Sequence, residues 1–70
     1  MDTSAIIDRL GGTKKTADLC GVTLAAVPPW RQTGIPPRHW QAIVEFAREH
    51  DIDGITYDTI QTARAAVRGA

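Results

Sequence analysis

A chain of 70 residues with a formal net charge of zero, 43% hydrophobic residues and 23% charged residues has the composition of one small soluble globular domain. Its apolar runs are too short for a membrane span, and its single cysteine, Cys20, excludes an internal disulfide. The beginning of the chain is acidic and lacks the layout of a secretory signal, so we expect a cytoplasmic protein.

The first predicted element is a helix near the start of the chain. Thr3 or Ser4 is expected to cap it, and Gly11 and Gly12 are expected to end it, because glycine readily takes the left-handed conformation that ends helices. Its inward positions are Ile6, Ile7 and Leu10. Frequent helix punctuation and the scarcity of period-two alternation along the chain predict an all-α domain of four or five short helices.

Two prolines interrupt the third predicted helix, which follows a second helix capped by Thr13. If Thr23 caps the third helix, Pro28 lies in its second turn, where a proline removes a hydrogen bond and pushes Val27 away from helical geometry. That arrangement costs about 3 kcal/mol in a continuous helix. We therefore expect a broken element, with a short turn over 24–27 and a new helix that starts at the proline pair. The residues carried by this new helix are Trp30, Arg31 and Gln32.

Two further helices complete the prediction. Pro37 suits the first turn of the fourth helix, where its missing N–H costs nothing. The apolar residues of that helix recur at i, i+3, i+4 and i+7, namely Trp40, Ile43, Val44 and Ala47. The last helix covers about 56–68 with Thr56 as its cap, and its inward residues are Tyr57, Ile60, Ala63 and Val67. This apolar face is expected either to form a homodimer contact or to pack within the chain.

The spacing between Ala17 and Val27 is typical of a helix-turn-helix motif. A small residue at Ala17 lets the next helix cross closely, and Gly21 ends one helix and directs the next. Cys20, Val22 and Val27 are expected to fill the angle between the two helices. We expect both Trp30 and Trp40 to pack in the core rather than to stack on bases.

The sequence TKKTADLCGVTLAAV resembles the lambda-repressor/Cro family of phage regulators, and the following tryptophan and GIPPRHW resemble a subgroup of small Cro-like proteins. The resemblance covers about residues 3–50. It implies a single lambda-repressor-like domain over residues 1–70, with the helix-turn-helix unit at about 13–33 and a distorted recognition helix. It also implies a sequence-specific DNA-binding repressor, phage-derived or bacterial, whose homodimer covers two half-sites about one DNA turn apart.

The resemblance assigns roles to individual positions. The start of the second helix lies on the DNA backbone in this family, so Thr13, Lys14 and Lys15 become phosphate contacts, which suits two cations at a helix N-terminus. The segment 23–32 enters the major groove, where the family usually places polar side chains. The base-facing positions in this chain are Thr23, Leu24, Ala25, Pro28 and Pro29. Only Thr23 among them can hydrogen-bond.

Three interpretations of this altered segment remain open. In the first, it docks on DNA through apolar contact with thymine methyl groups. The polar contacts available to that interpretation are Arg31, Gln32, Arg38 and His39, although the last two are equally consistent with solvated residues. In the second, Leu24, Pro28 and Pro29 form a protein-binding surface of an interaction module or antitoxin-like adaptor. In the third, the prolines have no functional meaning. The DNA-docking interpretation is favoured because the phosphate-facing cations are present beside the altered segment.

Charge is segregated along the chain although the total is zero. Residues 9–41 carry five basic side chains and one acidic, whereas residues 42–63 carry five acidic and one basic, so one side can hold a polyanion. No histidine, cysteine and aspartate spacing matches a metal site, GGTKKT lacks the full phosphate-loop pattern, and no nucleophile–base pair has catalytic spacing. We therefore expect double-stranded DNA as the partner, and no enzyme activity, metal, cofactor or small-molecule ligand.

Overall fold

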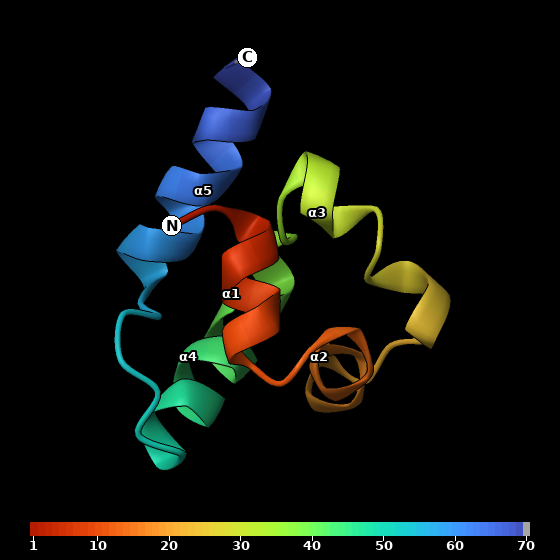
Figure 1. Cartoon of the computed structure of the whole chain (residues 1–70), viewed down its shortest axis with the longest axis vertical. Coiled ribbons are helices and arrows are strands. Elements are labelled where there is room, and N and C mark those ends of the chain that lie inside the picture. The colour runs from red at the N-terminus through yellow and green to blue at the C-terminus, as the bar shows by residue number, and fades with distance from the viewer. Residues whose placement is uncertain (70) are drawn as a thin grey trace.

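The computed structural model describes the backbone of residues 1–69 and the side chains of residues 1–66. Its α-helices are α1 (Thr3–Arg9), α2 (Thr13–Cys20), α3 (Trp30–Thr33), α4 (Trp40–Glu49) and α5 (Tyr57–Gly69), and its 3-10 turns are η1 (Leu24–Ala26) and η2 (Pro37–His39). The described backbone contains no strand, so the predicted all-α class is confirmed. α1 packs against α2, α3 and α5, and α4 packs against α2 and α5 (Figure 1).

The cap of α1 is Asp2. Its carboxylate accepts a hydrogen bond from the backbone N–H of Ala5 at 2.8 Å. The prediction of Thr3 or Ser4 as the cap is therefore wrong, and the side chain of Thr3 is buried instead. A carboxylate before the first turn satisfies an open N–H and interacts favourably with the positive end of the helix dipole, which explains the earlier start.

α2 begins at Thr13, which is the first helical residue rather than the cap. The residue before it, Gly12, has no side chain that could bond to the first-turn N–H groups, so α2 starts without a side-chain cap. The hydroxyl of Thr16 donates to the carbonyl of Gly12 at 2.9 Å and holds the turn from within the helix. The prediction of Thr13 as the cap is wrong by one position.

α2 ends at the predicted glycine. Gly21 has a φ of 69°, and the N–H of Val22 donates to the carbonyl of Ala17 at 3.0 Å. This closing pattern satisfies carbonyl groups that the helix end leaves open and brings Val22 back toward the helix. Residues 11–12 close α1 with the same pattern of hydrogen bonds.

The chain between residues 23 and 33 is broken, as the two prolines predict. η1 makes one 3-10 turn, and α3 begins only at Trp30. In a continuous helix the prolines would have to donate to the carbonyls four residues back, and they have no N–H to do so. The backbone of Val27 nevertheless keeps helical angles, with φ −79° and ψ −43°. The expectation that Pro28 displaces Val27 is therefore wrong, and the missing donors account for the break.

α4 has the amphipathic character that its spacing predicts. Pro37 opens η2, which leads directly into α4. Ile43, Val44 and Ala47 are buried, and Trp40 is half-buried. The ring N–H of Trp40 donates to the carbonyl of Ile35 at 2.8 Å, which fixes the loop before η2 against the start of the helix.

α5 packs its inner face within the chain. The hydroxyl of Thr56 accepts the backbone N–H three residues ahead at 3.1 Å, so the predicted cap is confirmed. Ile60 and Ala63 are buried, whereas Tyr57 is 48% exposed and its predicted inward position is wrong. The predicted inward position of Val67 lies outside the described side chains.

One core joins the helices, and the broken segment contributes to it. Its members are Ile6, Ile7, Leu10, Ala17, Val27, Trp30, Ile35, Ile43, Val44, Ala47, Ile55, Ile60 and Ala63. Val27 and Trp30 come from either side of the proline pair, so the broken segment is anchored at two points. No described helix is long and apolar enough to cross a membrane.

Candidate nucleic-acid interface

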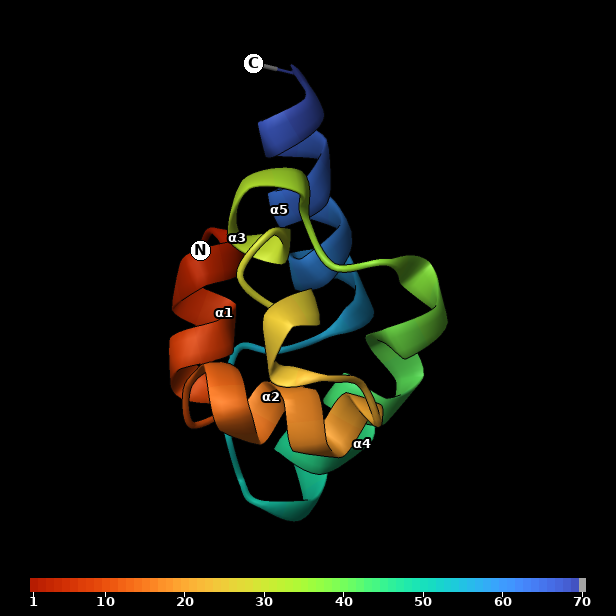
Figure 2. The ribbon, with the colours of Figure 1, turned by 90° about the vertical axis from the view of Figure 1, so that its right-hand side faces the viewer.

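The start of α2 and the segment that follows it lie on one side of the molecule. Figure 2 shows this side, with α2 at the front and η1 directly above it, and the two elements are in contact. We call residues 23–32 the recognition segment. Its exposed side chains are Thr23, Leu24, Ala25, Pro28, Pro29 and Gln32.

The exposed surface of the recognition segment is mostly apolar. Leu24 is 56% exposed, and both prolines are exposed close to it in the chain. Thr23 and Gln32 supply the hydrogen-bonding groups, since the side chain of Arg31 is directed toward α1. Such a surface can meet the methyl group of thymine, but it offers few donors and acceptors to the other base edges.

Lys14 and Lys15 stand at the uncapped start of α2, and both are exposed. The open N–H groups of the first turn add a positive partial charge to the two ammonium groups. The Nζ atom of Lys15 lies 6.0 Å from the ring centre of Phe46, at the outer limit of a cation–π contact, so this side chain leans toward α4. Lys14 makes no ion pair or hydrogen bond with the described side chains and is the cation better placed to meet an external anion.

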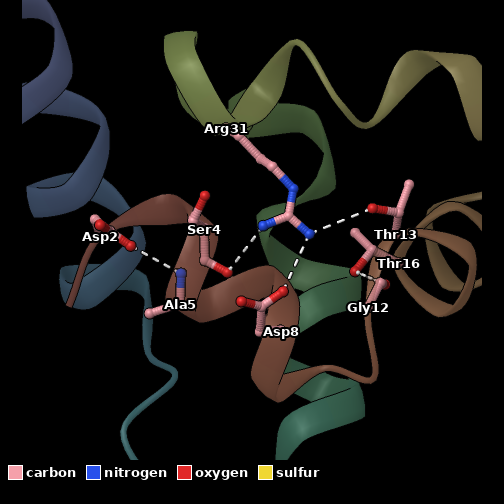
Figure 3. A network of polar contacts seen from close by, with 8 residues as sticks. All are labelled: Asp2, Ser4, Ala5, Asp8, Gly12, Thr13, Thr16 and Arg31. Atoms are coloured by element: carbon pink, nitrogen blue, oxygen red, sulfur yellow. Dashed lines mark hydrogen bonds and ion pairs between the residues drawn. The ribbon is translucent and has the colours of Figure 1, made fainter.

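Arg31 turns inward, toward α1 and the start of α2 (Figure 3). Its Nη1 donates to the carbonyl of Ser4 at 3.4 Å, and its Nη2 donates to Oδ1 of Asp8 at 3.1 Å and to Oγ1 of Thr13 at 3.3 Å. The guanidinium is thus engaged within the chain. Arg31 is therefore not available for the direct DNA contact that the sequence predicts.

Arg38 and His39 are adjacent but differently placed. Arg38 is exposed, as a contact with the phosphate backbone of DNA would require. His39 is only 9% exposed, and its ring centre lies 5.1 Å from that of Trp30. Burial lowers the pKa of His39, and the neighbouring Arg38 charge lowers it further, so the neutral ring is favoured. The prediction of His39 as a surface contact is wrong because its ring supports the core.

The acidic residues of the loop after α4 lie away from the recognition segment. The loop over residues 50–56 and the start of α5 lie on the opposite side of the molecule from η1 (Figure 1). Asp51, Asp53 and Asp58 are exposed there. These three carboxylates are thus kept away from the recognition segment, whereas Glu45 and Glu49 belong to α4, which packs against α2.

Cys20 and the tryptophans belong to the packing of the domain. Burial raises the pKa of the Cys20 thiol to about 11, so the group is a protonated thiol at neutral pH and a poor nucleophile or metal ligand. Trp30 is buried in the core, as predicted, and Trp40 packs against the core while remaining half-buried.

The contacts of Arg31 are the part of this interface that the sequence does not indicate. Asp8 lies 23 positions before Arg31, in a different helix, and no periodic pattern links the two residues. A basic residue in a recognition segment is normally interpreted as a nucleic-acid contact. The sequence feature that could have indicated this contact is the acidic Asp8 on the polar face of an amphipathic helix. Most surface helices have such a residue, so the feature does not identify Arg31 as its partner.

Comparisons of this chain with protein-family models, with curated proteins and with solved structures gave no match.

Proposed function

We propose that this chain is a sequence-specific DNA-binding regulator that docks its recognition segment in the major groove. The observation that carries the proposal is that α2, whose uncapped start carries the exposed Lys14, lies on the same side of the molecule as η1 of the recognition segment. A helix N-terminus with a cation attracts a phosphate group. Phosphate contacts position a protein on the duplex, and the neighbouring segment then reads the bases.

The chemistry of the recognition segment favours sites that contain thymine. Leu24, Ala25 and the two prolines present carbon atoms to the groove, which suits thymine methyl groups. Gln32 has the amide that pairs with an adenine edge, and Thr23 has a hydroxyl that pairs with several bases. Arg38 would add a contact to the phosphate backbone outside the groove.

Repression by occlusion would follow if two copies bound neighbouring half-sites about 34 Å apart, the spacing of one DNA turn. Ile60 and Ala63 are buried within the chain, so they are not free to form the dimer contact expected from the sequence. A homodimer would instead use the exposed side of α5, beginning with Tyr57.

The test is a salt titration of binding to a duplex that the protein itself selects from a random-sequence pool. Replacing Lys14→Ala should weaken binding and lower the slope of log affinity against log salt by about one. Arg48→Ala is the matched control, because Arg48 is an exposed cation near the end of α4 and should leave the slope unchanged. Failure of the wild-type chain to bind any duplex at low salt would overturn the proposal.

A second candidate function is a protein-interaction module on the same fold. The 56% exposure of Leu24, with two exposed prolines close by, favours it, because apolar groups that face solvent together often mark a partner site. The salt titration separates the two candidates. DNA binding that falls steeply with salt supports the regulator. Absence of binding to any duplex at low salt favours the interaction module.

A further inference from the structure

Arg31 joins the recognition segment to two other elements by polar contacts (Figure 3). It reaches the backbone of Ser4 and the carboxylate of Asp8 in α1, and the hydroxyl of Thr13 at the first residue of α2. Its contact with Asp8 is the one ion pair among the described side chains. Thr13 directly precedes Lys14, so the same guanidinium is tied to the helix end that carries the proposed phosphate contact.

The recognition segment needs such a contact because its backbone hydrogen bonds are made within 23–34 and do not fix it relative to α2. η1 has three residues and α3 has four, and helices this short have no appreciable stability by themselves. Val27 and Trp30 hold the segment on the core, but apolar contacts are non-directional and fix depth better than orientation. A guanidinium that donates to three acceptors from a rigid, planar group fixes orientation.

Orientation matters more for reading bases than for holding phosphates. The attraction between charges changes slowly with distance, so a small displacement leaves the phosphate contact of Lys14 nearly intact. Apolar contacts and hydrogen bonds with base edges are lost over about an ångström, because both depend on close approach. A contact that sets the angle of the recognition segment should therefore act on sequence discrimination more than on total affinity.

We propose that Arg31 is a positioning residue for sequence discrimination, held by Asp8 and Thr13, and that it does not itself contact DNA. The inference rests on the proposed DNA-binding function. The Arg31–Asp8 pair is exposed enough, at 30% and 66% of the two side chains, that it contributes little to folding. Its effect is on where the recognition segment lies relative to α2.

The test compares Asp8→Asn with Asp18→Asn. Both variants remove one carboxylate, but Asp18 is an exposed residue of α2 without a contact to Arg31. Discrimination is measured as the ratio of affinities for a selected duplex and for the unselected pool. We expect Asp8→Asn to lower this ratio about threefold, since an exposed ion pair can change an equilibrium by no more than a few-fold, while pool affinity stays within about twofold of the Asp18→Asn control.

Two variants of Arg31 itself complete the test, with melting temperatures measured to establish that each chain is folded. Arg31→Met keeps the apolar stem, and we expect it to reduce discrimination while the salt slope is unchanged. Arg31→Lys keeps the charge and the reach toward Asp8, and we expect it to restore part of the discrimination.

Three results would overturn the inference. A salt slope that falls by about one in Arg31→Met would show a direct phosphate contact. Unchanged discrimination in Asp8→Asn would remove the positioning role while leaving the proposed DNA-binding function in place. A wild-type chain that selects no sequence from the pool would overturn both.

Discussion

α2 and the recognition segment lie side by side on the same face of the domain, yet they are held in different ways. α2 is a continuous helix whose backbone hydrogen bonds define it and whose end is closed by Gly21. The recognition segment consists of a 3-10 turn, a proline pair and a four-residue helix. Its place depends on side chains that reach the core or neighbouring helices. The same kind of substitution should therefore have different consequences in the two regions.

The largest difference is expected at the glycines that follow each region. Gly34 and Gly21 both have positive φ values, 92° and 69°. A Cβ at Gly34 would lie 2.8 Å from the Cβ of Arg64 and 3.0 Å from its Cα, whereas a Cβ at Gly21 would meet nothing within 4 Å. We expect Gly34→Ala to lower the free energy of unfolding by about 3 kcal/mol or more, and Gly21→Ala by about 1 kcal/mol. Urea denaturation of the two variants measures both values.

Gly34, with φ 92° and ψ 162°, lies in a region that essentially only glycine adopts, whereas Gly21, with φ 69° and ψ 32°, lies in the left-handed helical region. Equal losses in the two glycine variants would show that neither this extra strain nor the approach of Arg64 raises the cost at Gly34. In that case the close packing of α5 against Gly34 would have no energetic weight, and the recognition segment would be no more tightly fixed at its end than α2.

The second contrast lies within the recognition segment. Val27 is fully buried and Leu24 is 56% exposed, three residues apart. Val27→Ala should lower the free energy of unfolding by about 2 kcal/mol because it leaves a cavity in the core. Leu24→Ala should change that free energy by less than about 0.5 kcal/mol, since more than half of the Leu24 side chain already faces solvent. Thermal denaturation measures the stability difference.

Leu24 should affect DNA affinity although it hardly affects stability. Under the proposed function, Leu24→Ala weakens binding to a selected duplex several-fold, with an unchanged salt slope, because an apolar contact carries no charge. A variant that binds its selected duplex as tightly as the wild-type chain would remove Leu24 from the interface.

The sequence predicted the regular parts of this fold well. The break before Trp30 follows from the chemistry of proline, the end of α2 follows from Gly21, and the buried face of α4 follows from helical spacing. Each of these features depends on residues that are close together in the chain. Local chemistry was therefore sufficient to anticipate these features, although it misplaced the caps of α1 and α2.

The roles of Arg31 and His39 could not be predicted in the same way. Each depends on a partner brought near by the tertiary fold: Asp8 for the arginine, and Trp30 for the histidine. Polar residues in short connecting segments are usually exposed, so the sequence favoured surface contacts for both. Their actual positions depend on how α1, α3 and η2 pack, which no local pattern specifies.

A third experiment makes the recognition segment more like α2 by allowing a continuous helix. Replacing Pro28 and Pro29 by Ser and Gln restores two backbone donors, and Val27 already has helical angles. We expect far-UV circular dichroism to show a gain of a few helical residues, with a change in the free energy of unfolding of about 1 kcal/mol or less. If the prolines contact thymine methyl groups, the sequence selected from a random pool should also change. An unchanged preference would leave the prolines without a role in base reading.

The smallest effect is expected from protonation of His39, which packs against Trp30 of the recognition segment and has no comparable contact with α2. Because its pKa is lowered in the folded state, the folded chain binds fewer protons than the unfolded chain below the ordinary histidine value of about 6.5. Stability is therefore unaffected by this group above about pH 6.5 and falls as the pH drops from there through the lowered pKa.

His39→Phe keeps an aromatic ring beside Trp30 and removes the titration, and Nε2 of His39 has no hydrogen-bond partner to lose. We expect the variant to lose less melting temperature than the wild-type chain between about pH 7 and pH 5. In the wild-type chain, hydrogen-exchange protection should fall in α3 before it falls in α2. Equal pH dependence in the wild type and His39→Phe would assign the acid sensitivity to the carboxylates, because the charged histidine would then impose no cost on the packing around Trp30.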